Sequence, residues 1–158
     1  MKNTFKRSGA ALISLVLLLV LAVSAGAASS QNVGVKFWKE RSDKESMANS
    51  GIDPDRTATL TRQANGTYTL TLPVMQVSKL GVTGYLSGLT IGDVTYDGTL
   101  TGDFNKATAV LTIKNLPASV LTGSDSNKAL AVTCSIKMDT ILLGDISTSA
   151  KMSIWVER

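Results

Sequence analysis

Histidine is absent from this sequence, and only one cysteine, Cys134, occurs among its 158 residues. Without an imidazole, the chain has no Ser-His-Asp or Cys-His arrangement and no histidine metal ligand. A single cysteine closes no internal disulfide and builds no cysteine-type zinc site. Cys134 alternates in phase with apolar neighbours, so we interpret it as a small buried hydrophobic residue.

The acidic residues show no arrangement typical of a site. Four aspartates lie near glycine-rich turns, but their spacing does not match a calcium-binding loop, so we interpret them as turn formers. A hydrolase would need two acids facing one cleft, and no pair is marked by its spacing. The sequence therefore predicts no catalytic residue and no metal site. The four residues are Asp93, Asp97, Asp103 and Asp125.

The one long apolar run, residues 10–22, stands close to the N-terminus. Basic residues precede it and the small segment Ser24-Ala25-Gly26-Ala27-Ala28 follows it. This pattern is typical of a secretory signal peptide. We predict cleavage after Ala27, which separates a signal peptide, 1–27, from one domain, 28–158. No second apolar run is long enough for a membrane helix, so we expect a secreted protein without a membrane span.

Charge is nearly balanced in the expected mature chain. The full sequence has 16 Lys and Arg against 12 Asp and Glu, and Lys2, Lys6 and Arg7 lie in the leader. The remaining 131 residues therefore carry 13 bases and 12 acids. A net charge of +1 displaces few counterions from a phosphate backbone, so we expect no nucleic-acid partner.

Apolar and polar residues alternate along most of the chain, which is typical of strands with one buried face. Asn65-Gly66 predicts a tight hairpin, since both residues tolerate positive φ. About eight short strands without a long amphipathic helix predict an all-β, antiparallel β-sandwich. The expected strands are 33–37, 57–63, 67–74, 82–86, 90–96, 99–104, 107–114, 130–138 and 152–156, with a loop or short strand at 141–149.

The segment between the first two strands is the most informative for function. Residues 42–48 predict one helical turn, with Ser42 as N-cap and Glu45 as its capping-box partner. Binding loops gather at the ends of a sandwich, and Ser46 with Met47 offers a hydroxyl beside a polarizable thioether. Such a pair suits an apolar ligand with an anionic group. The alternative is that Met47 closes the open end of the core.

Three segments carry a resemblance to a known family. They are Ser46-Met47-Ala48, Thr57-Ala58-Thr59-Leu60 and Asn65-Gly66-Thr67-Tyr68-Thr69-Leu70-Thr71-Leu72. Together they resemble the opening of near-iron-transporter (NEAT) domains and of related Ig-like modules on secreted Gram-positive proteins. The likeness is best over 33–74 and continues weakly through 98–116 and the final hairpin.

The resemblance implies an Ig-like sandwich of about eight strands that binds haem beneath a short helix. It implies that Ser46 hydrogen-bonds a propionate and that Met47 packs on the porphyrin. The family's iron ligand is a tyrosine in a Tyr-x-x-x-Tyr motif, whose two positions fall here on Thr148 and Met152. The thioether of Met152 is then the candidate iron ligand.

We add Lys44 or Lys151 as the partner of a ligand carboxylate, and Tyr85 as a residue that reaches the pocket from a turn. The sequence thus predicts a secreted, non-enzymatic binding module for an apolar anionic ligand. The resemblance implies haem or a similar molecule as that ligand and a role in iron uptake at a Gram-positive cell surface. The alternative is a structural or protein-interaction domain that docks another surface protein. Trp38 and Trp155, both out of phase with the apolar stripes, are expected to form an exposed patch unless a loop covers them.

Overall fold

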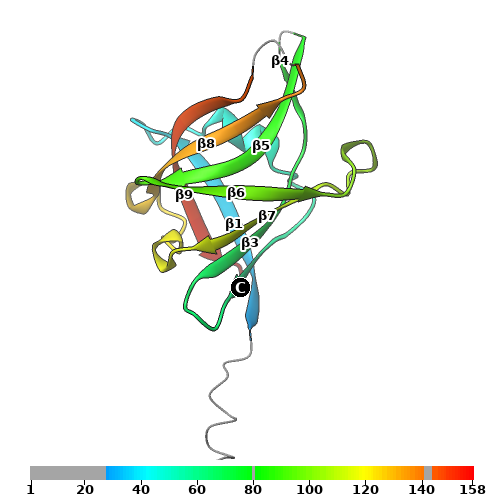
Figure 1. The fold of residues 1–158 in the computed structure, drawn as a ribbon. Coiled ribbons are helices and arrows are strands. Elements are labelled where there is room, and N and C mark those ends of the chain that lie inside the picture. Colours follow the sequence, from blue (N-terminus) through cyan, green and yellow to red (C-terminus); the bar gives the residue numbers. More distant parts are fainter. Residues whose placement is uncertain (1–27, 80, 141–143) are drawn as a thin grey trace, which may run out of the picture.

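The computed structural model describes residues 28–79, 81–140 and 144–158. The signal peptide expected at 1–27 lies outside these residues. The described chain is built of strands and short 3-10 turns, shown in sequence colours in Figure 1. The strands are β1 (Ser29–Lys39), β2 (Ala58–Arg62), β3 (Tyr68–Pro73), β4 (Val77–Lys79), β5 (Val82–Ile91), β6 (Val94–Thr101), β7 (Val110–Leu116), β8 (Leu130–Met138) and β9 (Ile146–Val156). The 3-10 turns are η1 (Met47–Gly51), η2 (Phe104–Lys106), η3 (Ala118–Val120) and η4 (Ser126–Lys128).

The strands form one antiparallel sheet that closes on itself. Its order is β4-β5-β6-β7-β3-β2-β1-β9-β8, and a further pairing of β5 with β8 joins the two ends. Eight strands therefore make a continuous ring, and β4 adds a short extension beside β5 (Figure 1). The prediction of an all-β antiparallel fold of about eight strands is confirmed, and the two layers expected of a sandwich are joined edge to edge.

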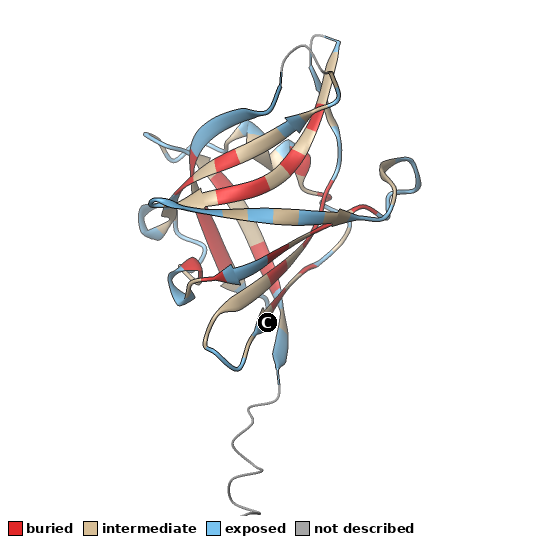
Figure 2. Ribbon diagram, viewed as in Figure 1, coloured by how far each residue is buried: buried red, intermediate tan, exposed pale blue. Residues whose placement is uncertain are grey.

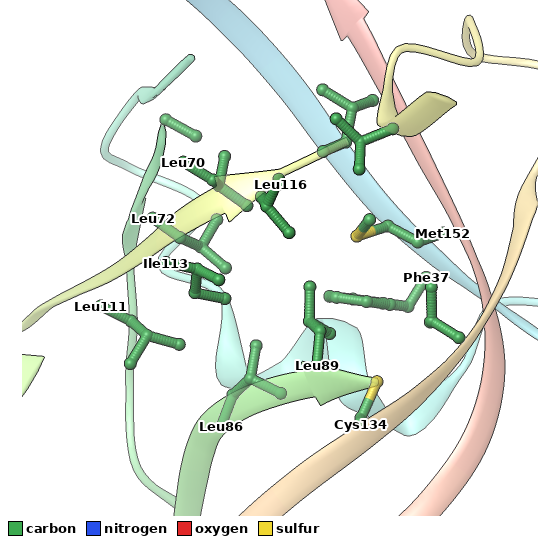
Figure 3. Close-up of a cluster of buried hydrophobic side chains, with 14 of the residues drawn as sticks. Phe37, Leu70, Leu72, Leu86, Leu89, Leu111, Ile113, Leu116, Cys134 and Met152 are labelled. Atoms are coloured by element: carbon green, nitrogen blue, oxygen red, sulfur yellow. The ribbon is translucent and has the colours of Figure 1, made fainter. Parts of the chain in front are cut away.

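The core fills the inside of this ring. Strand residues alternate between buried and exposed positions, which gives the banded pattern of Figure 2. In Figure 3, large side chains from different strands point toward one another, among them Phe37, Leu72, Leu89 and Met152. All four are fully buried. Cys134 lies in the same cluster with no exposed surface, so its predicted burial is confirmed.

The hairpin predicted at Asn65-Gly66 is present and joins β2 to β3. Gly66 has φ +83°, and the Asn65 side chain accepts hydrogen bonds from the backbone N–H and the hydroxyl of Thr67. These contacts fix the turn locally, as the Asn-Gly pair predicts.

The strands expected between residues 82 and 104 are fewer and longer than predicted. Gly88 and Gly98, which fall in the gaps between the expected strands 82–86, 90–96 and 99–104 and were therefore expected in turns, lie inside β5 and β6 instead. A Cβ on Gly98 would stand 2.4 Å from Leu111 Cδ1, and one on Gly88 would stand 2.8 Å from the Tyr96 carbonyl oxygen. These glycines therefore permit close packing between strands, while the turn falls at Gly92, where φ is +59°.

The helical turn predicted at 42–48 lies further along the chain. Residues 39–45 fold back on β1 through a bridge between Trp38 and Glu45, and η1 starts only at Met47. Ser46, rather than Ser42, is the N-cap, since its Oγ accepts a hydrogen bond from Ala48 N at 3.3 Å. The expected capping box between Ser42 and Glu45 is therefore wrong, because the bridge holds Glu45 in extended backbone.

Candidate functional site

A cavity of about 280 Å³ opens at one end of the ring, between η1 and the strands β4, β5, β8 and β9. β4, β5 and β8 run together in the upper part of Figure 1. Nearly all of the described lining side chains are apolar, and among them Lys79 alone carries a charge. The lining residues are Met47, Ala48, Gly51, Val77, Lys79, Val82, Gly84, Tyr85, Leu86, Ile136, Met138, Ile146 and Thr148.

The floor of the cavity continues the core. In the sheet register, Leu86 of β5 lies opposite Ile136 of β8, which in turn lies opposite Ile146 of β9. Side chains two residues apart share one face of a strand, so the stripe that is buried at Cys134 reaches the cavity at Ile136 and Met138. The apolar face that fills the ring thus extends to its open end and forms the floor of the cavity.

The opposite wall is η1. Met47 is 58% exposed and Ala48 is half-buried, and both line the cavity. Ile146, across the opening on β9, is 47% exposed. Exposed apolar side chains therefore stand on both sides of the mouth.

Asn49 holds η1 in place on β1. Its Oδ1 accepts a hydrogen bond from Phe37 N, and its Nδ2 donates one to Phe37 O, both at 2.7 Å. The side chain thus pairs with the backbone of β1 as a neighbouring strand would. Since Phe37 is fully buried in the core, this contact fixes the position of Met47 over the cavity relative to the rigid sheet.

Asn49→Ala is expected to lower the free energy of unfolding by about 1–3 kcal/mol, because it leaves the Phe37 amide without its partner in the described structure. Urea denaturation measures this change. Ser50→Ala alters an exposed residue of the same turn and serves as the control, with an expected change within about 0.5 kcal/mol. Equal effects of the two substitutions would contradict the anchoring role of Asn49.

The predicted site residues separate into two groups. Met47, Thr148 and Tyr85 line the cavity, so the structure brings them together from η1, β9 and β5. Tyr85 also packs its ring against Phe104, with ring centroids 5.2 Å apart. Ser46 caps η1, where its Oγ accepts a hydrogen bond from Ala48 N, and it is outside the lining set.

Neither lysine proposed from the sequence reaches the cavity lining. Lys44 is exposed in the turn before η1, where its carbonyl accepts from Lys39 N at 2.8 Å. Lys151 points to the outer face of β9, and its Nζ lies 3.8 Å from Asp43 Oδ1. Among the described lining residues the charge comes instead from Lys79, which no pattern in the sequence marks.

Met152 lies in the core rather than in the cavity. It shares a face of β9 with Thr148, but four residues at about 3.3 Å each carry it about 13 Å further along the strand. Its side chain is fully buried and points toward Phe37 and Leu116 in Figure 3. The interpretation of Met152 as an iron ligand therefore needs correction, because its side chain is fully buried in the core and does not line the cavity.

The two tryptophans lie on the outer face of β1 and β9 and are partly covered. The Trp38 indole N–H donates to Ser153 Oγ at 2.9 Å, and Lys36 Nζ lies 4.5 Å from the Trp38 ring centroid. The Trp155 ring covers Gly34, where a Cβ would come within 2.2 Å of the indole. Both side chains are half-buried, so the expected exposed aromatic patch is replaced by indoles that cap the sheet.

Burial raises the pKa of the Cys134 thiol from 9.0 to about 12. In the unfolded chain the thiol ionises at its ordinary pKa, so the unfolded state loses its proton first as the pH rises. The contribution of the thiol to stability is therefore complete below pH 9 and declines as the pH rises toward 12.

Between pH 8 and pH 10.5, Cys134 is expected to reduce the free energy of unfolding by about 2 kcal/mol. Urea denaturation at the two values measures the loss. Cys134→Ala, which lacks the titrating group, is the control, and the difference between the two chains isolates the thiol from other alkaline effects. An identical decline in both chains would contradict the raised pKa.

Within residues 28–79, 81–140 and 144–158, no helix has the length and apolar character needed to cross a membrane. The same part of the chain contains no group of three or more His, Cys, Asp or Glu residues placed to hold a metal ion.

Comparison with known structures defines the class of fold. No protein-family model matches the chain, and no curated protein matches it in sequence. The fold is that of NEAT domains: the chain is similar to the NEAT5 domain of IsdX2, a B. anthracis hemophore, solved in complex with haem, with a TM-score of 0.53. That likeness covers 84% of this chain and 99% of the other at 11% sequence identity. A point mutant of the same domain, also in complex with haem, matches with equal TM-score and identity over 98% of its length. The NEAT-like fold predicted from the sequence is thus confirmed.

Proposed function

We propose that the chain is an exported, non-enzymatic module that binds haem or a similar apolar anionic ligand in the cavity between η1 and β9. The observation that carries this proposal is the apolar lining itself, which joins Met47 to Thr148 across the opening. Apolar cavities with few polar groups are typical of small-molecule sites. The solved NEAT domains that share the fold bind haem, and residues 1–27 supply the export signal.

The size of the cavity indicates how such a ligand sits. Its volume of about 280 Å³ is just below the range of about 300–1,000 Å³ common for ligand pockets. One edge of a flat ring therefore enters the cavity, and the rest lies between the exposed side chains of Met47 and Ile146. Covering these two residues on binding adds to the apolar surface removed from water.

The same exposed rim favours a second candidate function. Met47 and Ile146 present apolar surface on both sides of one opening, and such surface also suits contact with another protein. In that case the module docks a partner and takes no small ligand.

Titration of the chain 28–158 with hemin distinguishes the two functions. If the cavity binds haem, the Soret band shifts and the change saturates at one hemin per chain. Met47→Ala removes the exposed part of the wall and is expected to weaken binding by about tenfold. A titration that matches free hemin in buffer would contradict the proposal and leave the docking function.

A further inference from the structure

The charge at the mouth of the cavity comes from Lys79 alone among the described lining residues. Lys79 is exposed on β4, and its Nζ lies 3.5 Å from Met47 Sδ. A thioether is a weak acceptor and an ammonium has three donors, so this contact uses little of the hydrogen-bonding capacity of Lys79. Within the described structure, no Asp or Glu forms an ion pair with it.

The same lining offers few donors for iron. Tyr85 lies opposite Lys137, on the face of β5 away from Gly84 and Leu86, and its ring packs on Phe104. The donors whose side chains face the cavity are the thioethers of Met47 and Met138. The Met138 sulfur is held against β5, where a Cβ on Gly84 would stand 2.8 Å away. Thioethers are neutral and soft, and ferric haem is held in proteins mainly by imidazole, thiolate or phenolate. The residues present fit a porphyrin ring and its carboxylate, and they fit poorly to ferric iron.

We propose that the cavity recognises a porphyrin by its apolar ring and by a carboxylate that pairs with Lys79, and that iron is not required. This inference rests on the proposed function and specifies the ligand class of the same site. The ring lies over Met47 and Ile146, and the carboxylate points out of the cavity toward the ammonium on β4. The bound porphyrin covers one side of this ion pair and shields it from water. This shielding strengthens an ion pair that is weak when it is exposed.

Three ligands and two variants test the inference. The ligands are hemin, metal-free protoporphyrin IX and the dimethyl ester of protoporphyrin IX, which keeps the ring and removes the negative charge. The variants are Lys79→Met, which keeps an apolar side chain at the mouth, and Lys44→Met, which removes an exposed lysine outside the lining. Absorbance and porphyrin fluorescence give the dissociation constants, and thermal unfolding checks that both variants fold.

We expect hemin and protoporphyrin IX to bind the unaltered chain within about threefold of each other. Lys79→Met should weaken both by about threefold to tenfold and leave the ester unchanged, while Lys44→Met should change none of the three. Hemin binding more than about tenfold tighter than protoporphyrin IX, or equal losses for acid and ester in Lys79→Met, would overturn the inference and leave the proposed function intact. Failure of all three ligands to bind the unaltered chain would overturn the proposed function itself.

Discussion

Thr148→Glu is expected to weaken porphyrin binding about a hundredfold, which corresponds to about 3 kcal/mol. Thr148 lies on β9 and lines the cavity opposite Met47. A carboxylate at this position must be desolvated beneath the apolar ring and repels the carboxylate of the ligand. Because Thr148 is exposed on the strand, the substitution leaves the core untouched and the free energy of unfolding nearly unchanged. The Soret titration measures the loss of affinity.

Ser147→Glu is the matched control for this prediction. Ser147 precedes Thr148 on β9, is also exposed, and points to the other face of the strand. The Ser147→Glu substitution introduces the same charge on the same strand outside the cavity, so we expect a porphyrin affinity within about twofold of that of the unaltered chain. If Thr148→Glu and Ser147→Glu weaken binding equally, the loss of affinity comes from the change in net charge, and the ligand does not lie in the cavity.

Met152→Ala is expected to lower the free energy of unfolding by about 3 kcal/mol. The Met152 side chain has no exposed surface and packs within the cluster of Figure 3, so its truncation removes buried apolar contacts and leaves a cavity. Porphyrin affinity, measured under conditions where the variant is folded, should stay within about twofold, because Met152 is remote from the cavity lining.

Met152→Leu separates packing from sulfur chemistry. Leucine keeps the volume of the side chain and removes the thioether, so we expect a cost below about 1.5 kcal/mol and unchanged affinity. A large loss of hemin binding in Met152→Leu with retained stability would show that the sulfur contacts the ligand, contrary to its position in the core.

The sequence predicts this fold well where burial and turn chemistry are local. Alternation along 130–138 predicts β8, and Asn65-Gly66 predicts the hairpin between β2 and β3. The turns expected around Gly88 and Gly98 are wrong, because a glycine in the sequence marks either a turn or a place where two strands approach closely. Closure of the ring through β5 and β8 is a long-range pairing, and strand alternation carries no information about the partner of a strand.

The candidate site was predictable only in part. Met47 and Thr148 follow from the resemblance and do line the cavity. Lys79 was missed because its position depends on β4, a three-residue strand that pairs with β5 and is too short to produce a periodic signal. Met152 was placed wrongly because it lies on the same face of the strand as the cavity residue Thr148 but farther along the strand. Alternation predicts the face on which a side chain lies, and only the register of strand pairing gives its distance from the cavity.

Methyl NMR of the methionines tests most directly whether the cavity between η1 and β9 holds the ligand. Residues 28–158 contain four methionines, of which Met47 and Met138 line the cavity while Met75 and Met152 do not. On addition of metal-free protoporphyrin IX, we predict large ring-current shifts for the methyl groups of Met47 and Met138 and small ones for Met75 and Met152. Shifts confined to Met75 or Met152, or no shifts at saturating porphyrin, would contradict the account.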